Sequence, residues 1–114
     1  MKQVNRKISQ FFSALADETR LKILLTLAER SRTVNEIYSI IGKDTMTLSA
    51  ISHQLSQLYD QNIVTYNKSG REKTFSLSGD FCWCILKDAL KHFDGKTKCK
   101  ACAHIKKEVH NKYT

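Results

Sequence analysis

The sequence predicts a mostly α-helical domain that carries one small β-hairpin. Three observations support this fold class. Apolar residues recur at helical spacing through the first half of the chain, a short turn joins two of the resulting helices, and two β-favouring runs follow. This order is that of a winged helix-turn-helix, and a length of 114 residues suits one domain.

Two helices open the predicted domain. Apolar residues at i, i+3, i+4 and i+7 between Ile8 and Leu15 predict the first helix. Asp17 can cap a second helix by accepting hydrogen bonds from backbone N–H groups of its first turn. The second helix is so rich in apolar residues over 21–28 that we expect it at the centre of the core.

The helix-turn-helix follows. Thr33 and Glu36 form a capping-box pattern that starts a third helix, and Gly42 should end it. A short turn over 43–46 then leads to a fourth helix at about 47–61. The buried residues of the third helix should be Ile37, Ile40 and Ile41.

A hairpin and a last helix complete the domain. The β-favouring runs 63–67 and 74–77 are separated by a segment that can turn through Ser69-Gly70. Ser78 can cap a long last helix, with Asp80 near its positive end. We therefore expect one folded domain over 1–95 and a basic, cysteine-containing tail over 96–114. The apolar side of the last helix should consist of Phe81, Ile85, Ala89, Leu90 and Phe93.

The charge favours a polyanionic partner. Lys and Arg outnumber Asp and Glu by 19 to 11, a formal net charge of +8, which indicates nucleic acid more than an anionic membrane surface. Four charged residues break the apolar run near the N-terminus, so we expect no signal peptide, no membrane span and a cytoplasmic location. Cysteines there should be reduced at rest. The four charged residues are Asp17, Glu18, Arg20 and Lys22.

The fourth helix has a polar side without charge. Ile51, Leu55 and Leu58 form its buried stripe, whereas the remaining positions over 49–57 carry Ser, Ala, His and Gln. Short polar side chains let a helix approach base edges in the major groove, where carboxylates would repel phosphates. The hairpin tip would then contact flanking phosphates as a wing. Its basic residues are Lys68, Arg71 and Lys73.

Two stretches resemble a known family. "ALADETRLKILLTLAE" is similar to the opening signature of the ArsR/SmtB winged-helix transcriptional repressors, and "SAISHQLSQLYDQNIVTYNKSGREKTFSLS" resembles their recognition helix and wing. The resemblance covers about residues 8–95 and implies a homodimer that binds an imperfect palindrome in a double-stranded operator. It implies groove contacts by Ser49, Ala50, Ser52, His53 and Gln54, and a dimer interface that includes Phe11, Phe12, Ile85 and Leu90.

The resemblance also implies a sensor. Family members usually release DNA when a metal ion binds, and some respond to oxidants through paired thiols. The family's Cys-x-Cys site in the third helix is absent here, and its Asp-x-His site on the last helix is matched only partly, by Asp80, Cys82 and His92. What remains is a cluster of thiols, with His92 and His104 as weaker candidates. The proposed ligands are Cys82, Cys84, Cys99 and Cys102.

Several readings of these thiols remain open. Four thiolates would suit Zn(II), Cd(II) or Cu(I), and three could bind As(III), as C-terminal cysteines do in some family members. Neighbouring lysines should favour thiolate, which equally permits a Cys99–Cys102 disulfide switch. Cys82 and Cys84 could instead be buried small residues, and the basic tail could only add phosphate contacts. A metal-handling protein whose helices mediate protein contacts is a further alternative, whereas no residue pattern suggests an enzyme.

Overall fold

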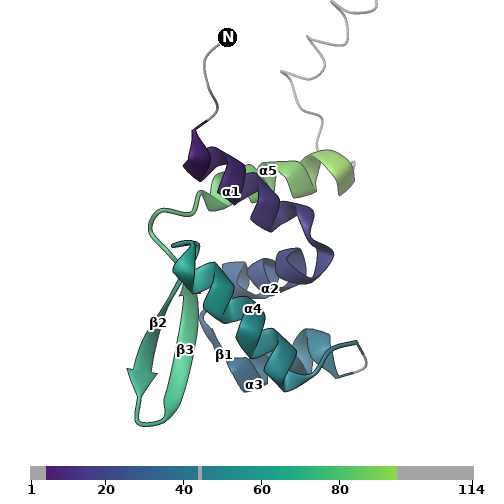
Figure 1. Cartoon of the computed structure of the whole chain (residues 1–114). Coiled ribbons are helices and arrows are strands. Elements are labelled where there is room, and N and C mark those ends of the chain that lie inside the picture. Colours follow the sequence, from purple (N-terminus) through teal and green to yellow (C-terminus); the bar gives the residue numbers. More distant parts are fainter. Residues whose placement is uncertain (1–4, 44, 95–114) are drawn as a thin grey trace, which may run out of the picture. The chain divides into compact units, whose positions relative to one another are not determined.

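The computed structural model describes residues 5–43 and 45–94, and the chain divides into two compact units, 1–81 and 82–114. The described part of the second unit forms one helix, α5 (Trp83–Asp94). The first unit contains, in chain order, α1 (Arg6–Ala16), α2 (Glu18–Glu29), β1 (Arg32–Thr33), α3 (Val34–Ile37), a π-helix η1 (Tyr38–Gly42), α4 (Leu48–Asp60), β2 (Val64–Ser69) and β3 (Glu72–Leu77) (Figure 1).

The three strands form one antiparallel sheet in the order β1-β3-β2. The hairpin register runs from Val64 opposite Leu77 to Ser69 opposite Glu72. Its turn contains Gly70 at φ 62°, a left-handed conformation that glycine adopts without steric cost. The predicted hairpin is thus confirmed, whereas the two-residue strand β1 was not predicted.

The helix starts follow from local side-chain bonds. The Asp17 carboxylate accepts from the backbone N–H of Arg20 at 3.0 Å, as predicted. Thr33 and Glu36 form the reciprocal capping box, with bonds of 3.2 and 3.1 Å. The Thr47 hydroxyl caps α4, whose predicted range is confirmed to within one residue at each end.

The core of the first unit joins α2, α3 and α4 to the base of the hairpin. Apolar residues on α2, α3 and α4 are removed entirely or almost entirely from solvent, which is the main stabilising term of such a domain. None of the helices in the described ranges is long and apolar enough to cross a bilayer. The fully buried large side chains are Ile23, Leu24, Ile37, Ile51, Leu55, Leu58 and Val64.

Two expectations about local structure are wrong. Ile40 is 52% exposed, because the chain widens from α3 into the π-helix η1 and the apolar stripe loses its α-helical register. Ser78 does not cap the last helix: its hydroxyl donates to the carbonyl of Asn62 at 2.6 Å, and α5 begins only at Trp83. Asp80 and Phe81 therefore precede α5 instead of lying in it.

Candidate nucleic-acid interface and thiol site

Helix α4 is fixed by its apolar side and by its cap. Ile51, Leu55 and Leu58 are fully buried. The Thr47 hydroxyl accepts from the backbone N–H of Ala50 at 3.0 Å, which satisfies one of the free donors of the first turn. The polar side of α4 is consequently held outward by a rigid element.

That polar side carries no charge. Ser49, Ser52 and His53 are exposed and Ala50 is half-buried, in agreement with the solvent-facing side predicted for them. Ser49, Ser52 and His53 border a shallow hollow between the start of α3 and α4. The hollow is lined by Val34, Asn35, Leu48, Ser49, Ser52, His53 and Ser56.

Gln54, which was predicted to contact the DNA groove, is also bound to a residue of α2. It is half-buried, and its Oε1 accepts from Nε of Arg20 on α2 at 2.9 Å. Nη2 of Arg20 also donates to Oε1 of Gln57 at 3.3 Å, and Nε2 of Gln57 lies 3.2 Å from Nε2 of His53. Sequence reasoning did not assign Arg20 to the site, because its partners lie 34 and 37 residues away.

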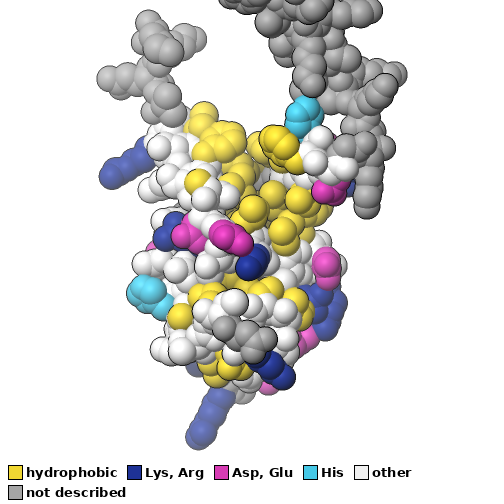
Figure 2. Space-filling view, turned by 90° about the vertical axis from the view of Figure 1, so that its right-hand side faces the viewer, with side chains coloured by type: hydrophobic (Ala, Val, Ile, Leu, Met, Phe, Trp, Pro, Cys, Tyr) yellow, Lys and Arg dark blue, Asp and Glu magenta, His cyan; other side chains and the backbone are white. Residues whose placement is uncertain are grey.

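The hairpin tip concentrates positive charge. Lys68, Arg71 and Lys73 are all exposed, and Lys68 lies directly opposite Lys73 in the strand register. Like charges placed opposite each other destabilise a sheet, so a partner anion would relieve this arrangement. Nζ of Lys73 lies 4.5 Å from the ring centroid of Tyr66. Figure 2 shows dark blue side chains at the lower end of the view, the end at which the hairpin turns in Figure 1.

The two described thiols are accessible. Cys82 and Cys84 are exposed and not joined in a disulfide, so the reading of them as buried small residues is wrong. The Cys82 carbonyl accepts from the N–H of Ile85 at 3.2 Å just before α5, and Cys84 lies in the first turn of that helix. His92 lies in the last turn of α5, with its ring 5.0 Å from that of Phe93.

The other predicted ligands, Cys99, Cys102 and His104, lie outside the described residues. Within 5–43 and 45–94, no three His, Cys, Asp or Glu side chains gather as a metal site would require.

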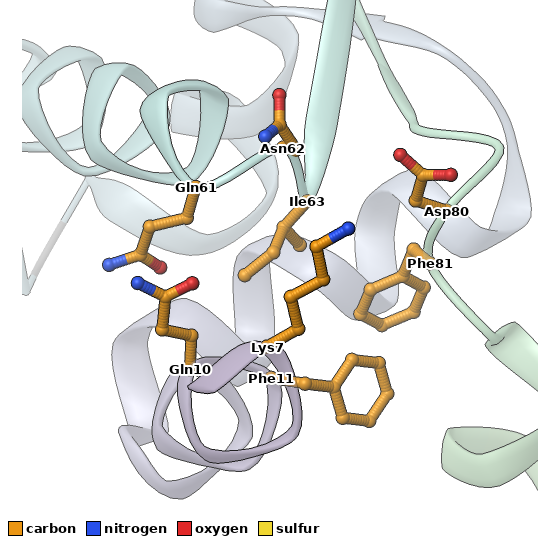
Figure 3. A pocket seen from close by; sticks show the side chains of 8 residues that line it. All are labelled: Lys7, Gln10, Phe11, Gln61, Asn62, Ile63, Asp80 and Phe81. Atoms are coloured by element: carbon orange, nitrogen blue, oxygen red, sulfur yellow. The ribbon is translucent and has the colours of Figure 1, made fainter. Parts of the chain in front are cut away.

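A pocket of about 310 Å³ lies beside the end of α4 (Figure 3). The rings of Phe11 and Phe81 lie together on one side of it, with centroids 5.1 Å apart, and the side chain of Lys7 extends between Ile63 and Phe81. Its lining residues come from α1, from the end of α4 and from the segment before Cys82. They are Lys7, Gln10, Phe11, Gln61, Asn62, Ile63, Asp80 and Phe81.

Hydrogen bonds tie that segment to the end of α4. Asn62 adopts φ 62°, and the next N–H, that of Ile63, donates to the carbonyl of Leu58 at 3.0 Å, as in a Schellman ending. Ser78 then bonds to this ending twice, from its hydroxyl to the Asn62 carbonyl and from its N–H to the Ile63 carbonyl at 2.9 Å. The segment before Cys82 is thus hydrogen-bonded to the C-terminal end of α4.

A helix-turn-helix with an exposed polar second helix and a cationic hairpin defines the chain as a winged helix-turn-helix protein. The family described as "Bacterial regulatory protein, arsR family" matches residues 17–66, from the cap of α2 into β2. The arsenical resistance operon repressor of Bacillus subtilis is 33% identical over 89 residues, which cover 75% of this chain and 79% of that protein. The chain therefore belongs to the arsR family.

Other similarities agree with this assignment. The transcriptional repressor SmtB homolog of Synechocystis sp. is 31% identical over 87 residues, covering 76% of this chain and 64% of that protein, so the match spans less than two thirds of that relative. The structure of HlyU from Vibrio cholerae superposes with a TM-score of 0.68 at 25% identity, over 82% of this chain and 97% of that one. The predicted fold class and family are confirmed, and the chain is a DNA-binding transcriptional regulator rather than an enzyme.

Proposed function

We propose that the chain is a repressor that binds a palindromic operator as a homodimer and releases it when a metal ion or metalloid binds its thiols. In this proposal, α4 of each copy enters the major groove, and each hairpin tip contacts flanking phosphates. The observation that carries the DNA half is the exposed, uncharged side of α4 combined with a hairpin tip on which Lys68 faces Lys73.

A substitution on α4 tests groove contact. Glutamates in place of Ser52 and His53 add two negative charges where base edges and phosphates would lie, so affinity for a duplex selected from a random library should fall at least tenfold. Lys22→Glu on α2 is the matched control, because it also changes the net charge by two but on a helix other than α4. Fluorescence anisotropy at several salt concentrations measures both. Equal affinities of the double variant and the parent would refute the proposal.

The homodimer is supported by exposed apolar side chains. On α1, Ile8 and Phe12 are 51% and 52% exposed, and on α5, Ile85 and Phe93 are 42% and 85% exposed. Figure 2 shows hydrophobic side chains open to solvent on the face in view. Large apolar side chains exposed to water mark interaction surfaces. These four residues lie on α1 and α5, the two helices expected to form the dimer interface. Phe11 and Leu90, also expected there, are half-buried within the single chain.

The sensor half rests on the chemistry of the thiols. Sulfur donors suit soft ions such as As(III), Cd(II), Zn(II) or Cu(I), and the Bacillus subtilis relative is by name an arsenical resistance operon repressor. Cys82 lies outside α5 and Cys84 within its first turn, so regular helix geometry does not force their side chains apart. Together with Cys99 and Cys102 they would supply the ligands, with His92 and His104 as secondary candidates.

The hydrogen bonds of Ser78 to Asn62 and Ile63 would connect the segment before Cys82 to the end of α4. Cys82 follows directly after Phe81, which is buried against Phe11 of α1. A ligand that draws Cys82 toward other thiols would pull on a segment that is bonded to the end of α4. Such coupling between two sites typically changes affinity 5- to 150-fold, roughly.

Elemental analysis combined with thiol titration tests the sensor. Protein purified under reducing conditions should bind one ion per thiol cluster, and Cys82→Ser should lower both the bound metal and the metal-induced loss of DNA affinity. Ser69→Ala, which removes a hydroxyl from the hairpin instead, is the control. Full metal response in Cys82→Ser would refute the role of this thiol. A loss of DNA affinity on oxidation, with an intramolecular disulfide in the mass spectrum and no response to metals, would favour the redox alternative instead.

A further inference from the structure

Arg20 joins α2 to the side chains that α4 presents for reading DNA. Its Nε donates to Oε1 of Gln54 at 2.9 Å, and its Nη2 donates to Oε1 of Gln57 at 3.3 Å. The N–H of Arg20 is itself bound to the Asp17 carboxylate that starts α2. Arg20, Gln54 and Gln57 are all half-buried, so the guanidinium is fixed from the core side of the site.

The chemistry of the guanidinium decides how both amides are oriented. Arginine has five N–H donors and no acceptor, so only the oxygen of each glutamine amide can face it. The orientation of a glutamine amide is ordinarily ambiguous, but here the donor set of Arg20 resolves it for both residues. The Nε2 groups of Gln54 and Gln57 consequently point away from Arg20.

The orientation of the Gln57 amide in turn determines the tautomer of His53. Nε2 of Gln57 lies 3.2 Å from Nε2 of His53, and an amide nitrogen can only donate. Nε2 of the histidine must therefore accept, which places the proton of the neutral imidazole on Nδ1. The exposed His53 ring is thus left with a donor, and not an acceptor, for any group in front of it.

We propose that Arg20 is a positioning residue that determines base specificity by turning the groove-facing side of α4 into a set of hydrogen-bond donors. This proposal rests on the proposed role of α4 in reading DNA. The donors, Nε2 of Gln54 and Nδ1 of His53, match guanine, which presents the acceptors O6 and N7, or thymine, which presents O4, whereas adenine places its N6 donor next to its N7 acceptor. A bidentate contact of glutamine with adenine also needs the amide oxygen, which Arg20 holds.

The histidine tautomer tests the relay without DNA. Nitrogen-15 NMR at alkaline pH, with the signals assigned by His53→Asn, should show His53 protonated on Nδ1. In Gln57→Glu, one carboxylate oxygen can accept from Arg20 and the other from the imidazole, so the proton should move to Nε2. A parent protein with the proton on Nε2, or an unchanged tautomer in Gln57→Glu, would overturn the relay.

Selection from a randomised duplex library tests the consequence for specificity. The parent should enrich guanine or thymine at the contacted position, and Arg20→Met should reduce that preference about tenfold, within the roughly 5- to 150-fold that two hydrogen bonds to one base supply. Arg20→Lys keeps the charge but not the planar fork, so it should reduce the preference as well. Circular dichroism verifies that both variants fold.

The possible outcomes separate this inference from the proposed function. An unchanged base preference in folded Arg20→Met or Arg20→Lys would overturn the positioning role while leaving DNA binding in place. A parent chain that enriches no sequence at all would overturn the proposed function and the specificity claim together, and the tautomer measurement would still decide whether the relay exists.

Discussion

Gly42 sets how closely η1 approaches α4. A Cβ atom at this position would lie 2.7 Å from Cδ1 of Ile51 and 2.8 Å from Cδ1 of Tyr38, and Ile51 is fully buried. We predict that Gly42→Ala lowers the free energy of unfolding by about 1–3 kcal/mol, the usual cost of overpacking. Gly79→Ala is the control, because nothing lies within 4 Å of its added Cβ. Urea titration measures both variants, and equal stabilities would contradict the close approach.

Glu36 gives the fold a pH dependence. The backbone N–H of Thr33 donates to its carboxylate, and together with the Arg30 guanidinium it lowers the pKa of Glu36 below its ordinary value of 4.5. A carboxyl group with a lowered pKa stabilises the fold above its unfolded-state pKa, and this stabilisation disappears as the pH falls through the folded-state pKa. The pH window therefore begins near 4.5 and extends downward.

Thermal unfolding of Glu36→Gln tests that sign. The glutamine can still accept from Thr33 but carries no charge, so we predict a lower Tm than the parent at neutral pH and a difference that shrinks below pH 4.5. Thr33→Val removes the capping hydroxyl, a minor cause of the lowered pKa of Glu36, and keeps the carboxylate, so its deficit should change less with pH than that of Glu36→Gln. A Glu36→Gln deficit that is constant from neutral to acidic pH would contradict the prediction.

Residue roles are predictable from the sequence where the partner lies within one helical turn. Asp17 and Thr33 are recognisable as caps because their donors are three residues ahead. The sequence shows Arg20 only as a charge that interrupts an apolar run, since nothing local indicates partners on α4. Ser78 is a residue type that often caps helices, but its hydroxyl bonds instead to Asn62, 16 residues earlier in the chain. This tertiary hydrogen bond replaces the predicted cap.

At the scale of an element, the hairpin combines a cost in stability with a positive surface. We predict that Lys68→Glu raises the free energy of unfolding by about 0.2–1 kcal/mol, because it replaces a cross-strand repulsion from Lys73 by an attraction. The same change should weaken DNA binding. It should also flatten the slope of log affinity against log salt by about 0.9 for each phosphate left without its cation. Lys68→Glu should therefore raise the free energy of unfolding while lowering the affinity for DNA.

Urea denaturation and anisotropy titrations measure these two effects. Lys22→Glu, which carries the same change in charge, should instead lower the stability, because it places a glutamate four residues from Glu18. Its DNA affinity should fall less than that of Lys68→Glu. If Lys68→Glu left the affinity and its salt dependence unchanged, the hairpin tip would not contact phosphates.

The elements that escaped prediction have weak local signals. Strand β1 is only Arg32–Thr33, and it exists because both residues pair with β3, more than forty positions away. The residues of η1 continue the apolar spacing that begins in α3, so the exposure of Ile40 could not be predicted from that spacing. Helices α1, α2 and α4 and the hairpin, by contrast, have clear periodicity and agree with the prediction, whereas α5 begins later than predicted, at Trp83.

For the molecule as a whole, the exposed apolar residues predict self-association. Phe12→Asp places a charge on the exposed apolar side of α1 and should convert a dimer into a monomer, as measured by sedimentation equilibrium. Ile40→Asp is the control, since Ile40 is equally exposed at 52% but lies on η1. A dimer that persists in Phe12→Asp would exclude this side of α1 from the interface.

The thiol site is the part of the function that the sequence could define least. Its spacing identifies candidate sulfur ligands, but the identity of an ion depends on how many of them converge and at what geometry. The structure shows Cys82 and Cys84 to be accessible, while the prediction about Cys99 and Cys102 stays a prediction.

The hydrogen bond from Ser78 to Asn62 joins the segment before Cys82 to the C-terminal end of α4, so a shift of that segment could tilt the helix. Thirteen residues of helix extend about 20 Å, so a tilt of about 5° at the Asn62 end would displace the opposite end by about 1.7 Å. That displacement exceeds half the length of a hydrogen bond, so Ser49 and its neighbours would lose registry with the base edges. In the proposed DNA complex, a small displacement of the segment before Cys82 would thus produce a larger displacement at the N-terminal end of α4.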